Sequence, residues 1–511
     1  MKVLRWIRVV AGVAVLATFC CVFVLDEQLV GQWYRVLPAT QFVPSLLSFI
    51  AVSGSVFGVS FIVIGLATLF IGRAYCSFLC PLGIVQDALL RLEGWFRIRR
   101  PYTYQKPRPV LRYAVLVLAG LSVSSGFLTV MLWLDPYSLF GRMAFSLLSS
   151  PVRHLGQLIA PMAEPRGILI FSDLAKGQIP SFALIVGLLL LLGFVALTLL
   201  AGRFYCTTIC PVGTLLGLLS RHSPLKIRID ADTCVNCGSC ERVCRSGCIN
   251  AKNGTVDHSR CVLCFDCLSV CPKGAINYAL RRSGPSVAPV RQRRKLLGGG
   301  LALAGLSVAP GIALRYAGAS EHEGSPVMPP GAVSIEQFKT RCTACHLCVS
   351  KCPTDVLQPS LIGYGVDGVL MPHLDFSRGY CEFDCNLCSR VCPNGAISPI
   401  TIAQKHTLQL GTVELDEDLC VSYTKNEDCG ACIEHCPTHA IYGELKDGVH
   451  LPKVKPEGCV GCGACVHTCP EKAVHVSANV VHKQAEILEQ AESLQPQDTP
   501  KDEQATDEFL F

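Results

Sequence analysis

Long apolar runs, separated by short polar loops, dominate the first 200 residues of the chain. Four runs, at about 3–25, 46–71, 110–134 and 180–201, contain few charged side chains. A helix needs about 20 apolar residues to cross the roughly 30 Å hydrocarbon core of a bilayer. Each run is that long, so the pattern predicts four membrane-spanning helices. The alternative, a set of buried core helices, fits such long runs less well.

A fifth, weaker apolar run covers residues 296–314, where it is rich in glycine and contains Pro310. It follows the sequence RRKLL and precedes YAGAS, which is typical of a small-residue cleavage site at Ala317 to Ala319. Two interpretations stay open: a twin-arginine-like export leader, or a fifth membrane anchor with basic flanks. Both place residues 320–511 on the opposite side of the membrane from the segment before this run.

Basic residues orient the predicted helices, because loops rich in Lys and Arg remain cytoplasmic. Three basic residues lie within the first eight positions, and eight lie between 73 and 112, whereas the loop at 26–45 has only Arg35. We therefore expect a multi-pass protein of the bacterial inner (cytoplasmic) membrane. Its N-terminus and the segment after residue 202 would be cytoplasmic, and residues 320–511 would be periplasmic.

Composition agrees with a membrane protein and adds a second anomaly. Half of the residues are hydrophobic, 16% are charged and the mean hydropathy is +0.41, which is too apolar for an ordinary soluble protein. The 31 cysteines are far above ordinary usage, and the chain is too long for a small disulfide scaffold, so the spacing of the cysteines must decide between disulfides and metal binding. The net charge of +6 comes largely from residues beside apolar runs and predicts no nucleic-acid partner.

Twenty-four cysteines form six motifs with the spacing of bacterial ferredoxins, and five of these motifs end in Cys-Pro. A 4Fe–4S cube needs four thiolates, so the motifs predict six 4Fe–4S clusters, and six such motifs in tandem argue against zinc or disulfides. The motifs are Cys234, Cys237, Cys240 and Cys244; Cys261, Cys264, Cys267 and Cys271; Cys342, Cys345, Cys348 and Cys352; Cys381, Cys385, Cys388 and Cys392; Cys420, Cys429, Cys432 and Cys436; Cys459, Cys462, Cys465 and Cys469.

In paired ferredoxin motifs the fourth cysteine ligates the other cluster. The first cluster would then take Cys271 in place of Cys244, and the second would take Cys244 in place of Cys271. The first motif lacks its proline, so Cys248 could replace Cys244. For the four later motifs, pairing of neighbours and nested pairing both stay open.

The segment GRAYCSFLCPLG at 72–83 returns as GRFYCTTICPVG at 202–213, each time after an apolar run. The two halves form a parallel repeat, and cysteines four apart share one face of a helix. We expect the two copies to bring four thiols together as a metal or iron–sulfur site, or as redox-active thiols. An inert packing motif is the alternative. These four are Cys76, Cys80, Cys206 and Cys210.

The repeated C-x3-C-P segments and the two motifs that follow make residues 1–280 resemble NapH-type membrane ferredoxins, in the wider group that includes NosR. Residues 291–470, with a twin-arginine-like leader and four motifs, resemble NapG-type exported polyferredoxins. The resemblance implies a NapH–NapG fusion that oxidises quinol and supplies a periplasmic reductase, nitrate reductase being the named case. The missing proline after Cys244, the additional Cys248 and the internal position of the leader depart from that pattern.

We expect a membrane α-helical bundle, of four spans plus a fifth anchor or signal-like segment, with two α+β domains of the bacterial-ferredoxin type. The expected divisions are a membrane domain at 1–205, a cytoplasmic two-cluster domain at 206–290, the leader or fifth span at 291–319, a periplasmic four-cluster domain at 320–480 and an acidic tail at 481–511.

The sequence has no Rossmann fingerprint, P-loop, haem-attachment motif or convincing nucleophile and base. We therefore predict electron transfer from the quinone pool to a periplasmic reductase or c-type cytochrome, as a quinol dehydrogenase component or as a carrier. One alternative is a relay from a cytoplasmic ferredoxin or an NADH-linked donor across the bilayer. Another is a redox assembly factor for a metalloenzyme.

Overall fold

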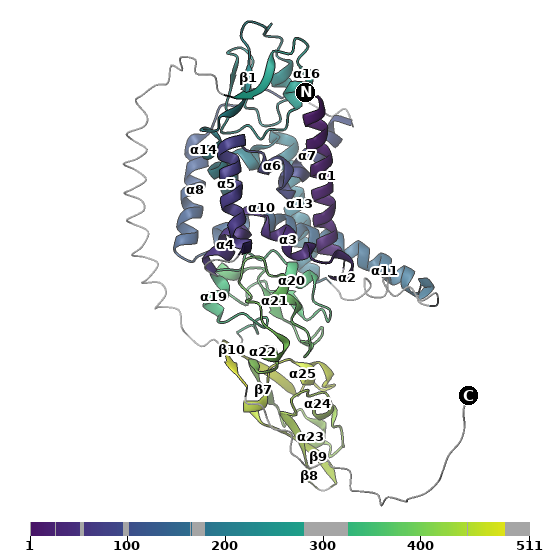
Figure 1. Cartoon of the computed structure of the whole chain (residues 1–511). Coiled ribbons are helices and arrows are strands. Elements are labelled where there is room, and N and C mark those ends of the chain that lie inside the picture. Colours follow the sequence, from purple (N-terminus) through teal and green to yellow (C-terminus); the bar gives the residue numbers. More distant parts are fainter. Residues whose placement is uncertain are drawn as a thin grey trace, which may run out of the picture.

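A computed structural model describes residues 2–25, 27–51, 56–95, 102–163, 165, 179–280, 325–446 and 448–485. The helical part of the chain lies between two regions built of short strands, short helices and loops (Figure 1). The predicted leader or fifth span at 291–319, and the tail beyond residue 485, lie outside the described residues.

Two helices are long and apolar enough to cross a membrane, α1 (Lys2–Val24) and α13 (Ser181–Ala201). Only 28% and 22% of their most apolar stretches are buried inside the protein. Most of their leucine, valine and isoleucine surface therefore faces outward, as expected for helices with a nonpolar surrounding. These two helices correspond to the first and fourth predicted spans.

The second and third predicted spans are divided into shorter helices. Residues 46–71 contain most of α4 (Phe42–Ala51), then η1 (Val56–Val59) and α5 (Ser60–Ile71). Residues 110–134 contain α8 (Pro109–Ser124) and α9 (Thr129–Leu134), separated at Gly126, whose φ is +76°. A helix of 16 residues is about 24 Å long and does not reach across a full hydrocarbon core. Four full-length spans are therefore not seen in the described residues.

Shorter helices make up the rest of the described part of this region, and one of them, α11 (Ser149–Ala163), extends outward from it (Figure 1). They are α2 (Glu27–Val30), α3 (Trp33–Ala39), α6 (Tyr75–Phe78), α7 (Pro81–Trp95), α10 (Pro136–Met143), η2 (Ala144–Leu148), α11 (Ser149–Ala163), η4 (Tyr205–Ile209) and α14 (Pro211–Ser220), of which η2 and η4 are π-helical turns.

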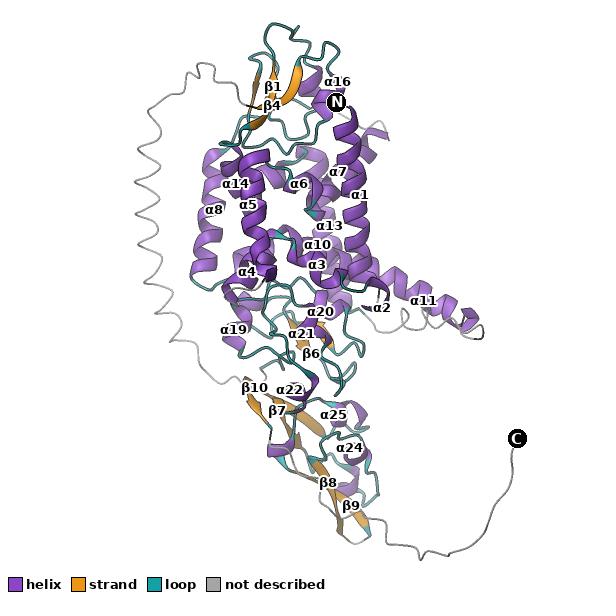
Figure 2. Ribbon diagram, in the orientation of Figure 1, coloured by secondary structure: helices purple, strands orange, loops and turns teal. Residues whose placement is uncertain are grey.

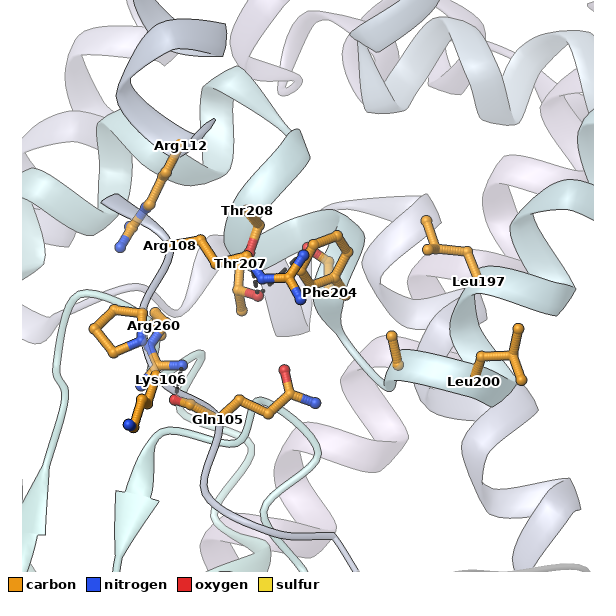
Figure 3. A pocket seen from close by; sticks show the side chains of 12 residues that line it. Gln105, Lys106, Arg108, Arg112, Leu197, Leu200, Phe204, Thr207, Thr208 and Arg260 are labelled. Atoms are coloured by element: carbon orange, nitrogen blue, oxygen red, sulfur yellow. Dashed lines mark hydrogen bonds between the residues drawn. The ribbon is translucent and has the colours of Figure 1, made fainter. Parts of the chain in front are cut away.

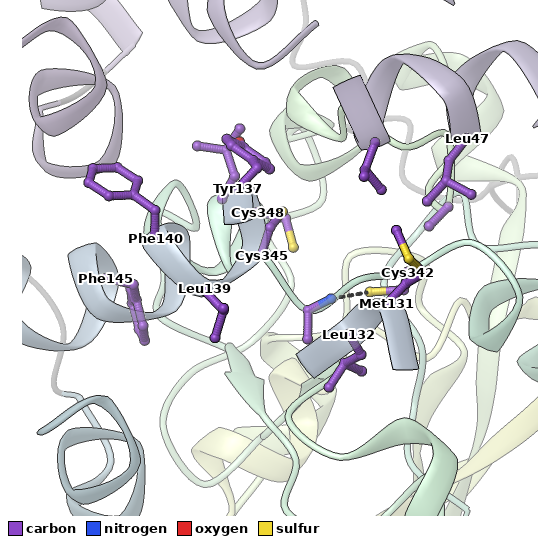
Figure 4. Close-up of a cluster of buried hydrophobic side chains, with 14 of the residues drawn as sticks. Leu47, Met131, Leu132, Tyr137, Leu139, Phe140, Phe145, Cys342, Cys345 and Cys348 are labelled. Atoms are coloured by element: carbon purple, nitrogen blue, oxygen red, sulfur yellow. Dashed lines mark hydrogen bonds between the residues drawn. The ribbon is translucent and has the colours of Figure 1, made fainter. Parts of the chain in front are cut away.

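The core of the helical region forms where α10 meets α1. Phe19 and Phe23 of α1 pack against Tyr137 and Phe140 of α10, with ring centroids 5.9–6.3 Å apart. The same cluster of buried side chains continues to Cys345 and its neighbours in the loop that follows residue 341 (Figure 4). The helices and the later cysteine-rich part of the chain thus share one apolar core.

The first ferredoxin region, residues 225–280, is closed by the antiparallel pair β1 (Leu225–Ile229) and β4 (Ile276–Leu280). Between these strands lie α15 (Ser239–Arg242), β2 (Ile249–Asn250), β3 (Thr255–Val256) and α16 (Asp266–Val270). Short helices, each following a cysteine loop and enclosed by a two-stranded ribbon, make an α+β arrangement of the ferredoxin kind.

The second ferredoxin region consists of a proximal unit (325–406) and a distal unit (408–485). The proximal unit contains α19 (Ile335–Lys339), α20 (Leu347–Ser350), β5 (Leu357–Pro359), η6 (Val366–Gly368), β6 (Pro372–Leu374), α21 (Leu387–Val391) and α22 (Ile402–His406). The distal unit contains β7 (Leu408–Leu415), α23 (Val421–Thr424), α24 (Ala431–Glu434), β8 (Ile441–Lys446), β9 (Val449–Val454), η7 (Pro456–Gly458), α25 (Ala464–Thr468) and β10 (Val474–Gln484). Strands β5 and β6, β7 and β10, and β8 and β9 form three antiparallel pairs.

The two ferredoxin regions lie at opposite ends of the helices, with the distal unit farthest away (Figures 1 and 2). At one end Arg5 of α1 pairs with Asp266 of the first ferredoxin region at 3.0 Å. At the other end the Lys351 ammonium group of the proximal unit donates to the carbonyl oxygen of Leu25. Helix α1 therefore runs from one region to the other, over about 35 Å.

Candidate iron–sulfur centres and the paired-cysteine site

Four thiols from two motifs line one cavity in the first ferredoxin region: Cys234, Cys237, Cys240 and Cys271. The loop turns tightly around this cavity because Asn236 and Gly238 have φ values of +52° and +70°. The sequence predicted this exchange of the fourth cysteine between motifs. Four thiols around one cavity suit a cluster with four iron atoms.

The second cavity of this region is lined by Cys244, Cys261, Cys264 and Cys267. Cys248 does not line it, although its Sγ lies 3.4 Å from Sγ of Cys244. The hydrogen bond between these two thiols lowers the pKa of Cys244 to about 7 and raises the pKa of Cys248 well above its usual value. Cys244 lines the cavity with the three thiols of the next motif, as the spacing predicts, whereas Cys248 lies beside it.

The proximal unit also groups its thiols across two motifs. Cys392 lies close enough to Cys342, Cys345 and Cys348 to interact electrostatically with each of them. In the same way, Cys352 lies close enough to Cys381 and Cys388 of the fourth motif to interact electrostatically with both. These two cysteines also interact with Cys385 of their own motif.

The distal unit has two cavities lined by four thiols each. Cys459, Cys462 and Cys465 share one cavity with Cys436, and Cys469 shares the other with three thiols of the preceding motif. Those three are Cys420, Cys429 and Cys432. The thiols of the four later motifs are therefore grouped between neighbours, third with fourth and fifth with sixth, and not in a nested order.

Within the described part of the chain, no group of three His, Cys, Asp or Glu side chains is placed to hold a single metal ion.

The cysteines of the two repeated segments form what we call the paired-cysteine site: Cys76, Cys80, Cys206 and Cys210. All four are buried, at 3–4% exposure, and they lie close enough to interact electrostatically across the two repeats. Cys76 lies in α6 and Cys206 in η4, whereas Cys80 and Cys210 directly precede α7 and α14. The expected single helical face is wrong, because the chain breaks its helix before the second cysteine of each pair.

The repeated glycine and proline positions explain these breaks. Gly72 ends α5 with a φ of +100°, and Gly202 ends α13 with a φ of +63°. Pro81 and Pro211 are the first residues of α7 and α14, a position where the missing N–H costs no hydrogen bond. Each repeat therefore turns sharply out of a long helix and starts a new helix at its second cysteine.

The last glycine of each repeat permits a close backbone approach. A Cβ on Gly83 would lie 2.2 Å from the carbonyl oxygen of Cys76, and a Cβ on Gly213 would lie 2.2 Å from that of Cys206. No other residue type fits such a contact without moving the backbone. The thiol-bearing turns are therefore held directly against the helices that follow them.

The two repeated arginines are buried, at 0% and 1% exposure. Nε of Arg73 donates to Sγ of Cys76 at 3.1 Å, and the same guanidinium donates to the carbonyl oxygen of Cys206. Arg203 instead pairs with Asp87 at 2.5 Å. Both arginines therefore lie inside the protein and connect its two halves.

Comparison with known proteins follows the same segments. A family described as a 4Fe-4S binding domain matches residues 54–102 and 183–230, which contain the two repeats. Families described as 4Fe-4S dicluster domains match 341–397, 380–440 and 426–473, and a further 4Fe-4S binding domain matches 261–275.

Three curated relatives resemble this chain in part. The ferredoxin-type protein NapF of Escherichia coli K12 is 30% identical over 136 residues, which is 26% of this chain and 74% of NapF. NapG of the same strain is 32% identical over 193 residues, 34% of this chain and 80% of NapG. The methylamine utilization ferredoxin-type protein MauM of Methylorubrum extorquens is 31% identical over 180 residues, 33% of this chain and 80% of MauM. The chain belongs to this family of ferredoxin-type proteins. It is a polyferredoxin with several 4Fe–4S domains, and hence an iron–sulfur electron-transfer protein.

In this polyferredoxin the paired-cysteine site lies directly beside the first ferredoxin region. The hydroxyl group of Ser77, next to Cys76, donates to the carbonyl oxygen of Val262, next to Cys261, at 2.6 Å. The Gly72 turn also approaches Leu263 of the same loop. The second cavity of the first ferredoxin region is therefore the neighbour of the paired-cysteine site.

On the opposite side, a buried polar chain joins the paired-cysteine site to the proximal unit. Tyr205, next to Cys206, donates its hydroxyl to the carbonyl oxygen of Leu134 at 2.9 Å. The next residue, Asp135, accepts from the Ser138 hydroxyl at 2.6 Å, which lies 2.8 Å from the hydroxyl of Thr343, beside Cys342.

Sequence reasoning missed most of these connecting residues. Asp87, Asp135 and Ser138 follow no motif, and their partners lie in distant segments. Gly83 and Gly213 could have been found, because the repeat preserves both.

Proposed function

We propose that this polyferredoxin is a transmembrane electron relay, with its 24 motif cysteines holding 4Fe–4S clusters and the paired-cysteine site serving as the central step. The observation that carries this proposal is the position of the paired-cysteine site. It is buried in the helical region, with contacts that lead to a cysteine cavity at one end and to a ring of cysteines at the other.

A central step is needed because of distance. The hydrocarbon core of a bilayer is roughly 30 Å thick, which is too far for a single electron transfer between clusters on its two faces. Helix α1 covers a similar length between the two ferredoxin regions. A redox group held by the paired-cysteine site would divide that distance into shorter steps.

The residues around the paired-cysteine site fit such a group. When bound, an iron–sulfur cluster would store and release one electron at a time. Its thiolates would place negative charge in a dry interior, and the buried guanidinium of Arg73 lies beside Cys76 to offset it. The Cys206 thiol itself donates to the amide oxygen of Gln86 at 2.8 Å.

The route continues through the second ferredoxin region. The proximal and distal units meet where the N–H of Cys381 donates to the carbonyl oxygen of Cys462. The last cavity includes Cys429, which is exposed, so the final redox group would lie near the protein surface. The distribution of Lys and Arg supports a cytoplasmic first region and a periplasmic second region, and a periplasmic reductase or c-type cytochrome would then collect electrons at the distal unit.

A second candidate is oxidation of membrane quinol, with electrons entering at the paired-cysteine site. The burial of that site among helices supports this candidate, since a lipid-soluble donor could reach it from the bilayer. The resemblance to NapH-type proteins supports it as well. In this case the first ferredoxin region would be a separate entrance for electrons from a cytoplasmic ferredoxin.

The relay is tested in sealed liposomes that contain cytochrome c, with reduced ferredoxin added outside. We expect the wild-type protein to reduce the entrapped cytochrome c, and the quadruple variant Cys76→Ser, Cys80→Ser, Cys206→Ser and Cys210→Ser to lose this activity. The matched control carries Cys20→Ser and Cys21→Ser in α1, at thiols outside the proposed route. Equal rates in the quadruple variant and the wild type would refute the relay. Reduction only when a menaquinol analogue is present in the bilayer would favour the second candidate.

A further inference from the structure

A cavity of about 540 Å³ opens at the end of α13 nearest to the first ferredoxin region. One wall is apolar and consists of Leu197, Leu200 and Phe204 (Figure 3). Leu200 is 87% exposed, so this wall is continuous with the outward-facing surface of a helix that is long and apolar enough to cross a membrane. The volume lies in the range of cavities that bind small molecules.

The opposite wall is strongly cationic. Four basic residues line it, Lys106, Arg108, Arg112 and Arg260, and none of the lining residues is acidic. Lys106 and Arg108 are exposed, and the Arg108 guanidinium lies 5.3 Å from the centre of the Phe204 ring. The cavity therefore offers positive charge directly beside an apolar surface.

Two of these arginines are buried, and each has a guanidinium nitrogen without a hydrogen-bond partner among the described residues. Arg112 and Arg260 are each 4% exposed. Arg112 donates to Ser259, and Arg260 pairs with Asp257 at 2.7 Å. Nε of Arg112 and Nη2 of Arg260 have no partner among the described residues. Buried donors without partners are costly, so these groups indicate an acceptor in the cavity.

Two buried hydroxyl groups complete the polar wall. Thr207 and Thr208 are 4% and 6% exposed and belong to the π-helical turn that carries Cys206. Thr207 donates its hydroxyl to the carbonyl oxygen of Arg203 at 3.0 Å, so the guanidinium groups and the Thr208 hydroxyl are the donors that face a phosphate oxygen here. An acceptor held here would contact the first ferredoxin region through Arg260 and the paired-cysteine segment through Thr208.

We propose that this cavity binds the phosphate headgroup of an anionic membrane phospholipid, whose acyl chains would lie along Leu197 and Leu200. The proposal rests on the membrane location in the proposed function. Of the four cations that line the cavity, only Arg260 pairs with a carboxylate of the described residues, so the lining favours a full negative charge over a neutral quinone. The apolar wall favours a lipid over free phosphate. The bound headgroup would hold the first ferredoxin region against the helix ends next to the paired-cysteine site.

The test uses the full-length protein with its clusters, purified in mild detergent. The double variant Lys106→Gln and Arg108→Gln removes two exposed charges of the cavity and leaves the buried arginines in place. Each basic residue near a membrane surface contributes about 1 kcal/mol toward anionic lipid, so affinity for short-chain phosphatidylglycerol should fall on the order of thirtyfold. The matched control, Arg228→Gln and Lys252→Gln, removes two charges of the first ferredoxin region outside the cavity.

Native mass spectrometry counts the phospholipids that remain bound, and titration measures the affinity. We expect the wild type and the control to retain a phospholipid that the double variant loses. Equal retention in all three proteins would overturn the proposal. So would equally tight binding of inorganic phosphate, or loss of a co-purified quinone in place of a phospholipid. Iron content and electron transfer are measured on the same samples, so a failed relay with intact lipid retention would count against the proposed function only.

Discussion

The backbone N–H of Cys381 donates a 2.8 Å hydrogen bond to the carbonyl oxygen of Cys462. These cysteines belong to different pairs of motifs, so two ferredoxin units meet backbone to backbone at their cluster loops. The contact depends on a glycine of the same loop. A Cβ on Gly463 would lie 2.0 Å from the Phe376 ring of the proximal unit.

The first prediction separates this contact from ordinary backbone strain. Gly463 and Gly448 have similar φ values, +78° and +83°, but a Cβ on Gly448 would meet open space. Gly448→Ala should lower the free energy of unfolding by about 1–2 kcal/mol, because left-handed backbone is unfavourable for a residue with a Cβ. Gly463→Ala should cost clearly more, because Phe376 must also move. Calorimetry measures both, and equal losses of stability would show that the contact between the units is unimportant.

A second prediction concerns the glycine against the carbonyl oxygen of Cys206. Gly213→Ala should displace the thiol-bearing turn and lower the iron and sulfide content of the purified protein. Gly193→Ala is the matched control, since a Cβ there has no neighbour within 4 Å in α13. That variant should keep its iron and gain up to about 1 kcal/mol in helix stability. Full iron content in Gly213→Ala would argue that the paired-cysteine site holds no cluster.

The sequence predicted those parts of the molecule that depend on local spacing. The exchange of Cys244 and Cys271 between cavities follows from the motif, because three closely spaced cysteines enclose one cluster and the fourth lies beyond a helical turn. Helix ends inside apolar sequence were not predictable in this way. Residues 46–71 read as one hydrophobic run, yet they divide into helices, and composition alone does not mark such a break.

The surroundings of the paired-cysteine site were also beyond sequence reasoning. The partner of Arg203, Asp87, lies 116 positions away in the sequence and belongs to no motif. Two further arginines, Arg8 and Arg245, pair with the same carboxylate. Such a group forms only when α1, α7, the turn after α13 and the first ferredoxin region come together.

The third prediction follows from that shared carboxylate, which is 1% exposed. Asp87→Asn removes the carboxylate partner of the buried Arg8 and Arg203, whereas Arg245 keeps its second partner, Asp266. Breaking a buried ion pair on one side costs about 3–5 kcal/mol. We expect a lower unfolding temperature and faster proteolysis between the helices and the first ferredoxin region. The control Asp232→Asn removes an exposed carboxylate of that region. Similar proteolysis of the two variants would mean that the ion pairs do not hold the regions together.

A fourth prediction distinguishes the two thiols that lie 3.4 Å apart in the first ferredoxin region. Cys244 lines the cluster cavity and Cys248 does not. Cys244→Ser should therefore lower the iron content by about one cluster's share or yield the electron paramagnetic resonance signal of a three-iron cluster, whereas Cys248→Ser should retain four-iron spectra. The reverse result would make Cys248 the ligand.

The last prediction concerns pH and His482, which lies in β10 with both ring nitrogens lacking a partner among the described residues. Burial lowers the pKa of His482 to about 4, from an ordinary value near 6.5. Between those two values the unfolded chain binds a proton that the folded chain does not. The contribution of this residue to stability is therefore constant above about pH 6.5 and decreases as the pH falls toward 4.

Solvent near the partly exposed ring reduces the effect to the order of 1 kcal/mol, which corresponds to about 4–8 °C in the unfolding temperature of a unit this size. Between pH 7.5 and pH 5 we therefore expect the unfolding temperature of His482→Gln to fall less than that of the wild type, by the amount that His482 contributes. His475→Gln alters an exposed histidine of the same strand and should leave the decrease unchanged. If both variants lose as much stability as the wild type on acidification, the destabilising proton binds elsewhere, and the packing of β10 against Val333 does not depend on a neutral His482.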